Sequence, residues 1–97
     1  MHIIKTKTLK DFYTKHADAK NDIIAWIDIT KGASWKSFND LQNLFPYLSL
    51  LKNSRTVFNI GGNKYRLVVK FIFKTNTVYI RFIGTHAEYD KIDANNI

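Results

Sequence analysis

Residues 65–73 decide the fold of this 97-residue chain, and they read Tyr65-Arg66-Leu67-Val68-Val69-Lys70-Phe71-Ile72-Phe73. Side chains that alternate with a period of two indicate a β-strand with one buried face. One face is wholly apolar and carries Tyr65, Leu67, Val69, Phe71 and Phe73. The other face mixes cations with apolar residues, namely Lys64, Arg66, Val68, Lys70, Ile72 and Lys74. The stretch therefore predicts a strand with one face on a hydrophobic core and one basic face.

Two further strands are predicted beside this one, over residues 56–60 and 77–84, because both stretches are rich in Val, Ile, Phe and Tyr. Gly61-Gly62-Asn63 predicts the first turn, since these residues tolerate positive φ, and Thr75-Asn76 predicts the second. The second hairpin is expected to pair Phe73 with Val78, Phe71 with Ile80, and Val69 with Phe82. A slip of one residue would bring Arg81 into the core, which favours this register.

The same register places a basic surface on the opposite face. It pairs Lys70 with Arg81, Ile72 with Tyr79, Val68 with Ile83, and Arg66 with Thr85, and the first hairpin adds Asn59 opposite Arg66. Two cations directly opposite each other cost a few tenths of a kcal/mol to about 1 kcal/mol. Such a cost is often kept where a ligand supplies the missing anion. We predict an anion site of Arg66, Lys70 and Arg81, with Tyr79 as a ring for base stacking; the alternative is a solvated face with splayed side chains.

The first half of the chain has the spacing of helices. Thr8-Leu9-Lys10-Asp11 has the form of a capping box at the start of a first helix. A second helix is predicted from about Asn21 to Lys31, with Gly32 as its stop. Its buried face is expected to carry Ile23, Trp26, Ile27 and Thr30. Ser37 to Asp40 repeats the capping pattern before a short third helix, which ends at Pro46.

Helices followed by a meander of strands predict an α+β fold. We expect a single domain over residues 1–97, with N-terminal helices packed on one face of a small antiparallel sheet. Ile3-Ile4 is expected to add an edge strand. A length of 97 residues and a hydrophobic content of 45% fit one core and one domain.

The composition excludes several classes of protein. Cysteine is absent, which excludes disulfides, thiol catalysis and cysteine-ligated zinc. No run approaches the roughly 18 apolar residues of a membrane span, and the apolar part of the first residues is too short for a signal peptide. We therefore expect a cytoplasmic protein that does not bind membranes.

The charge is concentrated in one half of the chain. The net charge is +7, and the 47 residues from Leu41 to Ala87 contain no carboxylate. The same stretch holds seven cations: Lys52, Arg55, Lys64, Arg66, Lys70, Lys74 and Arg81. A basic half indicates a polyanionic partner, most often nucleic acid. The alternative is that the charge serves solubility.

The segment after the last strand contains the only histidine expected near the basic face, His86. An imidazole titrates near neutrality and suits general acid or base catalysis. Tyr89 lies three residues further on and shares a face with His86 if the segment is helical. A capping or packing role for His86 is the alternative. The chain has no acidic cluster or histidine pair that indicates a metal site, so we expect neither a metal nor another cofactor.

Two long motifs together resemble one family, the HigB toxins of the RelE-like group in type II toxin–antitoxin systems. They are Val57-Phe58-Asn59-Ile60-Gly61-Gly62-Asn63-Lys64-Tyr65-Arg66-Leu67-Val68 and Val78-Tyr79-Ile80-Arg81-Phe82-Ile83-Gly84-Thr85-His86-Ala87-Glu88-Tyr89-Asp90. The resemblance implies an endoribonuclease, an mRNA interferase that cleaves mRNA on translating ribosomes. It also implies a helix-turn-helix antitoxin, HigA, as partner, with contact to DNA only through the antitoxin complex.

Carried over by position, Arg66 and Arg81 match the arginines that hold the scissile phosphate, and His86 and Tyr89 match the group that transfers a proton or stacks on a base. We expect the other polar side chains of the basic face to bind RNA, namely Lys64, Lys70, Lys74, Asn59, Tyr79 and Thr85. The basic face lacks an acidic residue to act as a base, and Glu88 and Asp90 are the only nearby carboxylates.

Two other functions remain open at this point. A noncatalytic RNA-binding module, or an inactive relative of the toxins, would use the same basic sheet. A DNA-binding repressor would need a recognition helix with Arg, Asn or Gln on an exposed face, and the sequence shows no obvious one.

Overall fold

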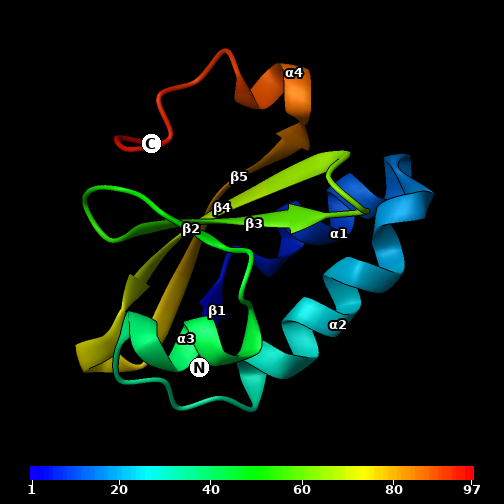
Figure 1. The fold of residues 1–97 in the computed structure, drawn as a ribbon. Coiled ribbons are helices and arrows are strands. Elements are labelled where there is room, and N and C mark those ends of the chain that lie inside the picture. Colours follow the sequence, from blue (N-terminus) through cyan, green and yellow to red (C-terminus); the bar gives the residue numbers. More distant parts are fainter.

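The computed structural model describes residues 1–97. Along the chain the elements are β1 (His2–Ile4), α1 (Thr6–Lys15), the 3-10 turn η1 (Ala17–Ala19), α2 (Lys20–Lys31), α3 (Phe38–Leu44), β2 (Ser49–Leu50), β3 (Arg55–Ile60), β4 (Tyr65–Ile72), the 3-10 turn η2 (Phe73–Thr75), β5 (Thr77–Thr85) and α4 (His86–Tyr89). The predicted order, with most of the helices before a meander of strands, is confirmed (Figure 1).

All five strands form one sheet in the order β1-β5-β4-β3-β2. The meander from β3 to β5 is antiparallel, as predicted, and Ile3 and Ile4 do lie in an edge strand. The sequence did not predict β2, which adds a short antiparallel strand beside β3. The expectation of a wholly antiparallel sheet is wrong at that edge, because β1 runs parallel to β5. A parallel neighbour needs a long crossover, and the helices between β1 and β2 provide it.

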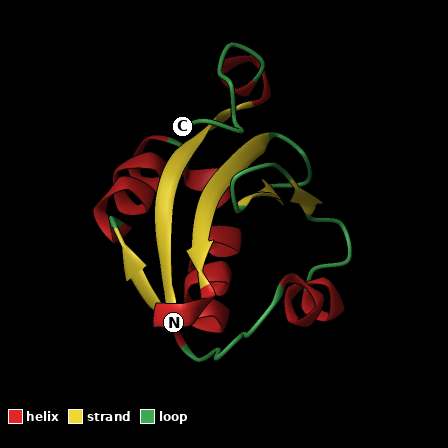
Figure 2. Cartoon of the chain, turned by 90° about the vertical axis from the view of Figure 1, so that its left-hand side faces the viewer, coloured by secondary structure: helices red, strands yellow, loops and turns green.

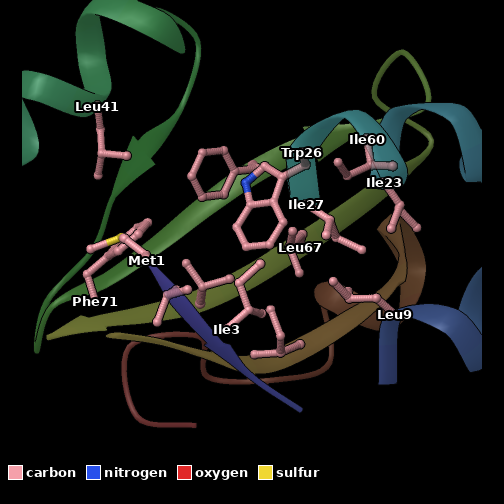
Figure 3. Packing of buried hydrophobic residues seen from close by; sticks show 14 of the residues in the cluster. Met1, Ile3, Leu9, Ile23, Trp26, Ile27, Leu41, Ile60, Leu67 and Phe71 are labelled. Carbon is pink, nitrogen blue, oxygen red and sulfur yellow. The ribbon is translucent and has the colours of Figure 1, made fainter. Parts of the chain in front are cut away.

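The main core lies between the sheet and the first three helices. The predicted face of α2 is confirmed, since Ile23, Trp26, Ile27 and Thr30 are all buried. The three apolar residues of this face pack with Leu9 of α1, Leu41 of α3 and the inward side chains of the strands, as the labelled residues in Figure 3 show. The apolar face of β4 also lies in this core, which fixes the opposite face of the sheet as its outer face.

The predicted register of the β4–β5 hairpin is wrong by two residues near the turn. Phe71 pairs with Val78 and Val69 with Ile80, whereas β4 was expected to continue through Phe73. It stops at Ile72 because Phe73–Thr75 form the turn η2, which Asn76 closes with φ 53°. A shift of two residues keeps each side chain on its face, so this part of the core is as predicted.

A β-bulge then changes the faces in the second half of β5. The register shifts between Val68 and Val69, and Arg81 has no pairing partner. The extra residue turns the alternation by one position. As a result Phe82 lies opposite Val68 on the outer face, while Ile83 packs on the main core, the reverse of the prediction. The bulge keeps Arg81 exposed. The predicted register also kept Arg81 out of the core, but it did so without an extra residue.

Two of the predicted helix caps do not form. α1 already begins at Thr6, after Lys5 with φ 73°, so the expected capping box at Thr8 lies inside the helix. Ser37 does precede α3 but makes no side-chain cap, and Asp40 accepts from the main-chain N–H of Lys36 instead.

The C-terminal segment covers the middle of the outer face, a feature that the sequence did not predict. Ala94 is buried against Val57 and Val68, and the contacts around this small second core come from Leu51, Phe82, Tyr89, Ile92 and Ile97. Asn95 ties the segment down, since its side-chain oxygen accepts from the Lys52 N–H at 2.8 Å. Figure 1 shows the segment, in red, returning from α4 toward β3 and β2. It divides the outer face into two ends.

Candidate active site

Arg66 is the centre of one end of the outer face, which we call the Arg66 end; it comprises Asn59, Arg66, His86 and Tyr89. Arg66 pairs with Asn59 of β3, as predicted, and its Nη1 donates to the Asn59 Oδ1 at 2.6 Å. On the other side it pairs with Gly84, one residue from the predicted Thr85. The guanidinium carbon lies 6.0 Å from the centre of the Tyr89 ring. Asn59 and Tyr89 therefore orient the guanidinium from two sides.

Gly84 is glycine because the ring of Phe82 fills the space above it. A Cβ at residue 84 would lie 2.6 Å from the Phe82 Cζ and 3.1 Å from a Glu88 carboxylate oxygen. Phe82 in turn lies 6.5 Å, between ring centres, from Tyr89. The glycine thus permits the packing that supports Tyr89 beside Arg66.

The short helix α4 is held in place by a capping box. The Thr85 N–H donates to Glu88 Oε1 at 2.8 Å, and the Glu88 N–H donates to Thr85 Oγ1 at 3.2 Å. The N–H of Thr85 holds the pKa of Glu88 below its usual value. The His86 N–H also donates to the main-chain oxygen of Lys64 at 3.2 Å. These bonds fix the start of α4 against the β3–β4 turn, at the end of the two long strands (Figure 2).

The ring of His86 is exposed, and its Nδ1 lies 3.4 Å from Oδ2 of Asp90, one helical turn further on. The side chain of His86 is 54% accessible and belongs to neither hydrophobic cluster, so it does not pack. Its side chain is also not the cap of α4, because Thr85 has that role. Asp90 orients the ring through Nδ1. Nε2 makes no hydrogen bond in the structure.

Lys64 does not lie on the outer face. It belongs to the turn rather than to β4, and its Nζ lies 3.1 Å from Oδ2 of Asp18 in η1. The Tyr65 hydroxyl donates to the other oxygen of this carboxylate at 2.7 Å. The bond from Tyr65, and then the bond from Lys64, hold the pKa of Asp18 below its usual value, and the same carboxylate raises the pKa of Tyr65. Lys64 is thus engaged on the helical side.

The remaining predicted residues gather at the opposite end of the outer face, which we call the Lys70 end. Lys70, Tyr79 and Arg81 line a cavity of about 430 Å³ together with Arg55, Ile72 and Thr75, and Lys74 is exposed in the adjoining turn. The predicted pair of Lys70 and Arg81 is wrong, since Lys70 pairs with Arg55 and Tyr79. Lys70 lies four positions after Arg66 in β4, about 13 Å along the strand. The residues predicted to form a single anion site therefore lie at two separate ends of the outer face.

Arg55 is a residue of this second site that sequence reasoning missed. Its guanidinium donates to the main-chain oxygen of Ile97 at 2.8 Å and to that of Asn53 at 2.8 Å. A signal was present, because the register that pairs Asn59 with Arg66 extends to Arg55 and Lys70. The predicted strand began at Thr56, one residue too late to use it.

No group of three or more His, Asp or Glu side chains gathers in a geometry for a metal ion. No helix has the length and apolar character that crossing a membrane would require.

Comparisons with known proteins give one consistent family. Residues 19–92 match the model of the HigB toxins, described as the RelE-like toxic component of a toxin–antitoxin system. The chain is 36% identical over 92 residues to the mRNA interferase toxin HigB of Escherichia coli K12, which covers 93% of this chain and 88% of that protein. The mRNA interferase HigB of Shigella flexneri matches to the same extent, and that of Escherichia coli O6:H1 is 26% identical over 94 residues. The matched region contains both ends of the outer face, and this chain belongs to the HigB family of RelE-like toxins.

Proposed function

We propose that this chain is an endoribonuclease that cleaves mRNA without a metal ion, and that the Arg66 end is its active site. The observation that carries the proposal is the placement of Arg66. Asn59 and Tyr89 orient it on a strand surface without carboxylates, beside the helix that presents His86. The relatives named as mRNA interferases support mRNA as the substrate.

The chemistry follows from the groups at this end. The 2′-hydroxyl of the RNA attacks the adjacent phosphorus, a new bond from O2′ to phosphorus forms, and the bond from phosphorus to O5′ breaks. The products carry a 2′,3′-cyclic phosphate and a 5′-hydroxyl. Arg66 stabilises the charge that develops on the phosphoryl oxygens, which is usually the largest contribution to such catalysis. The need for a 2′-hydroxyl also makes the reaction specific for RNA over DNA.

His86 is the proposed proton-transfer group. Asp90 orients its ring through Nδ1, so that Nε2 is the atom that takes the proton from the 2′-hydroxyl or gives one to O5′. Tyr89 has a different role in this proposal. Its ring lies under the Arg66 guanidinium and positions it, with the hydroxyl as a second polar group near the phosphate.

The Lys70 end contributes binding without taking part in the chemical step. Lys70 and Arg81 make no salt bridge in the structure, and Tyr79 offers a ring within the same cavity. Cations with this exposure attract the phosphates of a strand beyond the cleavage position. The ribosome is the proposed place of cleavage, a HigA-type helix-turn-helix antitoxin is the proposed inhibitor, and the cytoplasm is the compartment that holds both.

One experiment tests the active site and the mechanism together. The chain is incubated with a single-stranded RNA alone, with EDTA present, and in parallel with an mRNA on translating ribosomes, in the magnesium buffer that ribosomes require. We expect cleavage by the wild-type chain and none at a position that carries a 2′-deoxy substitution. His86→Gln keeps hydrogen bonding but cannot carry the proton, so it should lose most of the single-turnover rate.

A noncatalytic RNA-binding module is the second candidate, favoured by the cations and aromatic ring of the Lys70 end. The two candidates differ in growth arrest on expression. An endoribonuclease arrests growth, and His86→Ala or Arg66→Ala abolishes the arrest. Arrest that persists in both variants would contradict the proposed active site.

A further inference from the structure

The largest cavity of the molecule lies beside the Arg66 end and has no role in the chemistry above. Its volume is about 560 Å³. It lies between residues 44–48, at the end of α3 and just beyond it, and the β3–β4 turn. It exists because β2 pairs only with Thr56 and Val57, so the edge of β3 from Phe58 onward has no neighbouring strand. The volume is typical of a site for a small organic group.

The lining combines aromatic rings with amide side chains. Phe45, Tyr47 and Phe58 line the cavity, and the ring of Tyr47 is unusual because 85% of that residue is exposed. Asn59 and Asn63 supply the amides, and the side chain of Asn63 makes no hydrogen bond in the structure. Aromatic faces for stacking and amides for the polar edge are the groups with which proteins bind unpaired nucleobases.

Asn59 connects this cavity directly to the proposed active site. Its Oδ1 accepts from Arg66 at 2.6 Å, while the same residue lines the cavity. No carboxylate lines the cavity, so nothing there repels the phosphates of a bound strand. If Arg66 holds a phosphate, the neighbouring nucleotide of the same strand can therefore reach the cavity.

We propose that this cavity binds an unpaired nucleobase of the RNA, from a nucleotide next to the scissile phosphate, with Tyr47 as the stacking ring. The inference rests on the proposed function, since it assigns the substrate contact that lies next to Arg66. The Asn63 amide without a partner and the bond from Arg66 to Asn59 favour a nucleobase over an apolar segment of a protein partner, which would leave the Asn63 amide unsatisfied.

The binding test uses an RNA that cannot be cleaved, a single strand with 2′-deoxy at the cleavage position, and measures affinity between about 50 and 200 mM salt. Tyr47→Ala should weaken binding about tenfold at every salt concentration, because stacking does not depend on counterions. Tyr47→Phe keeps the ring and should bind as the wild type does. Ile24→Ala removes an exposed apolar side chain that lines no cavity, and it serves as the matched control.

Arg66→Ala separates this inference from the proposed function. Loss of one phosphate contact should reduce the salt slope by about 0.7 on a single strand, whereas Tyr47→Ala should leave the slope unchanged. If Arg66→Ala acts as expected and Tyr47→Ala binds RNA normally, the inference is wrong and the proposed function stands. If the wild-type chain binds the RNA neither free nor on ribosomes, the proposed function fails and the inference fails with it.

Photocrosslinking identifies the occupant. The same RNA with 4-thiouridine beside the cleavage position should crosslink to the peptide that contains Tyr47. A Tyr47→Ala variant that keeps its RNA affinity but loses affinity for the antitoxin would show that the cavity is a protein docking site, and that result would overturn the proposal. A variant that changes neither affinity would show an inert groove and would overturn it equally.

Discussion

Thr85→Ala tests whether the capping box places α4 at the Arg66 end. The substitution removes the hydroxyl that accepts from the Glu88 N–H and leaves the bond from the Thr85 N–H to Glu88 in place. Replacing an N-cap by alanine costs about 1 kcal/mol, or about fivefold in the ratio of closed to open helix. A helix of four residues has no stability of its own, so we expect this change as local opening of α4 rather than as global unfolding.

Hydrogen exchange followed by NMR measures the opening directly. The amides of Asp90 and Lys91, which donate to His86 and Glu88, should exchange about fivefold faster in Thr85→Ala. The amide of Val69 in β4 should be unchanged. Thr85→Ser and Thr85→Asn both supply a capping oxygen and should restore protection. Unchanged exchange in Thr85→Ala would refute the capping argument. If the α4 amides of Thr85→Asn are protected from exchange but the variant does not cleave RNA, the Thr85 hydroxyl contacts the RNA instead.

Three further substitutions test other parts of the structure. Tyr65→Phe removes the main cause of the lowered pKa of Asp18, so the pKa of that carboxyl, measured by NMR titration, should move up toward its usual value. A lowered pKa in the folded state adds stability above the usual Asp range, and this stability is lost as the pH falls through the folded value. The variant should therefore lose less stability in acid than the wild type. Lys70→Thr removes the like-charge pair with Arg55, so the free energy of unfolding in urea should rise by a few tenths of a kcal/mol. The dependence of its RNA affinity on salt should fall by about 0.7 in slope. Ala94→Asp places an unpaired carboxylate against Val57 and Val68, so the C-terminal segment should detach and trypsin should cut at Lys91 faster; a rate equal to that of the wild type would contradict the second core.

The sequence predicted those parts of the fold that local patterns specify. The spacing of Ile23, Trp26 and Ile27 can only bury one face of a helix, and the alternation from Tyr65 to Phe71 can only bury one face of a strand. The pairing of Asn59 with Arg66 followed from the tight turn between them. Periodicity and turn chemistry were sufficient for these features.

The site itself depended on features with no local signal. A bulge at Arg81 changes which side chains of β5 face outward, and nothing in the alternation indicates where an extra residue leaves the ladder. Burial of Ala94 on the outer face is a contact between distant segments, and alanine carries no pattern that predicts it. The C-terminal segment separates Arg81 and Lys70 from Arg66, which sequence reasoning places together, and the bulge turns Phe82 outward to pack against that segment.

The separation of the two arginines is the central claim, and single-turnover cleavage at saturating RNA tests it most directly. Arg66→Ala should lower the rate roughly 10²-fold or more, because it removes charge stabilisation at the phosphate. Arg81→Ala, at the Lys70 end, should weaken RNA binding and reduce its salt dependence but keep the saturated rate within about tenfold of the wild type. Thermal stability should change little in either variant, since neither side chain is in a core. A normal rate in Arg66→Ala, or an equal loss in Arg81→Ala, would contradict an active site at the Arg66 end alone.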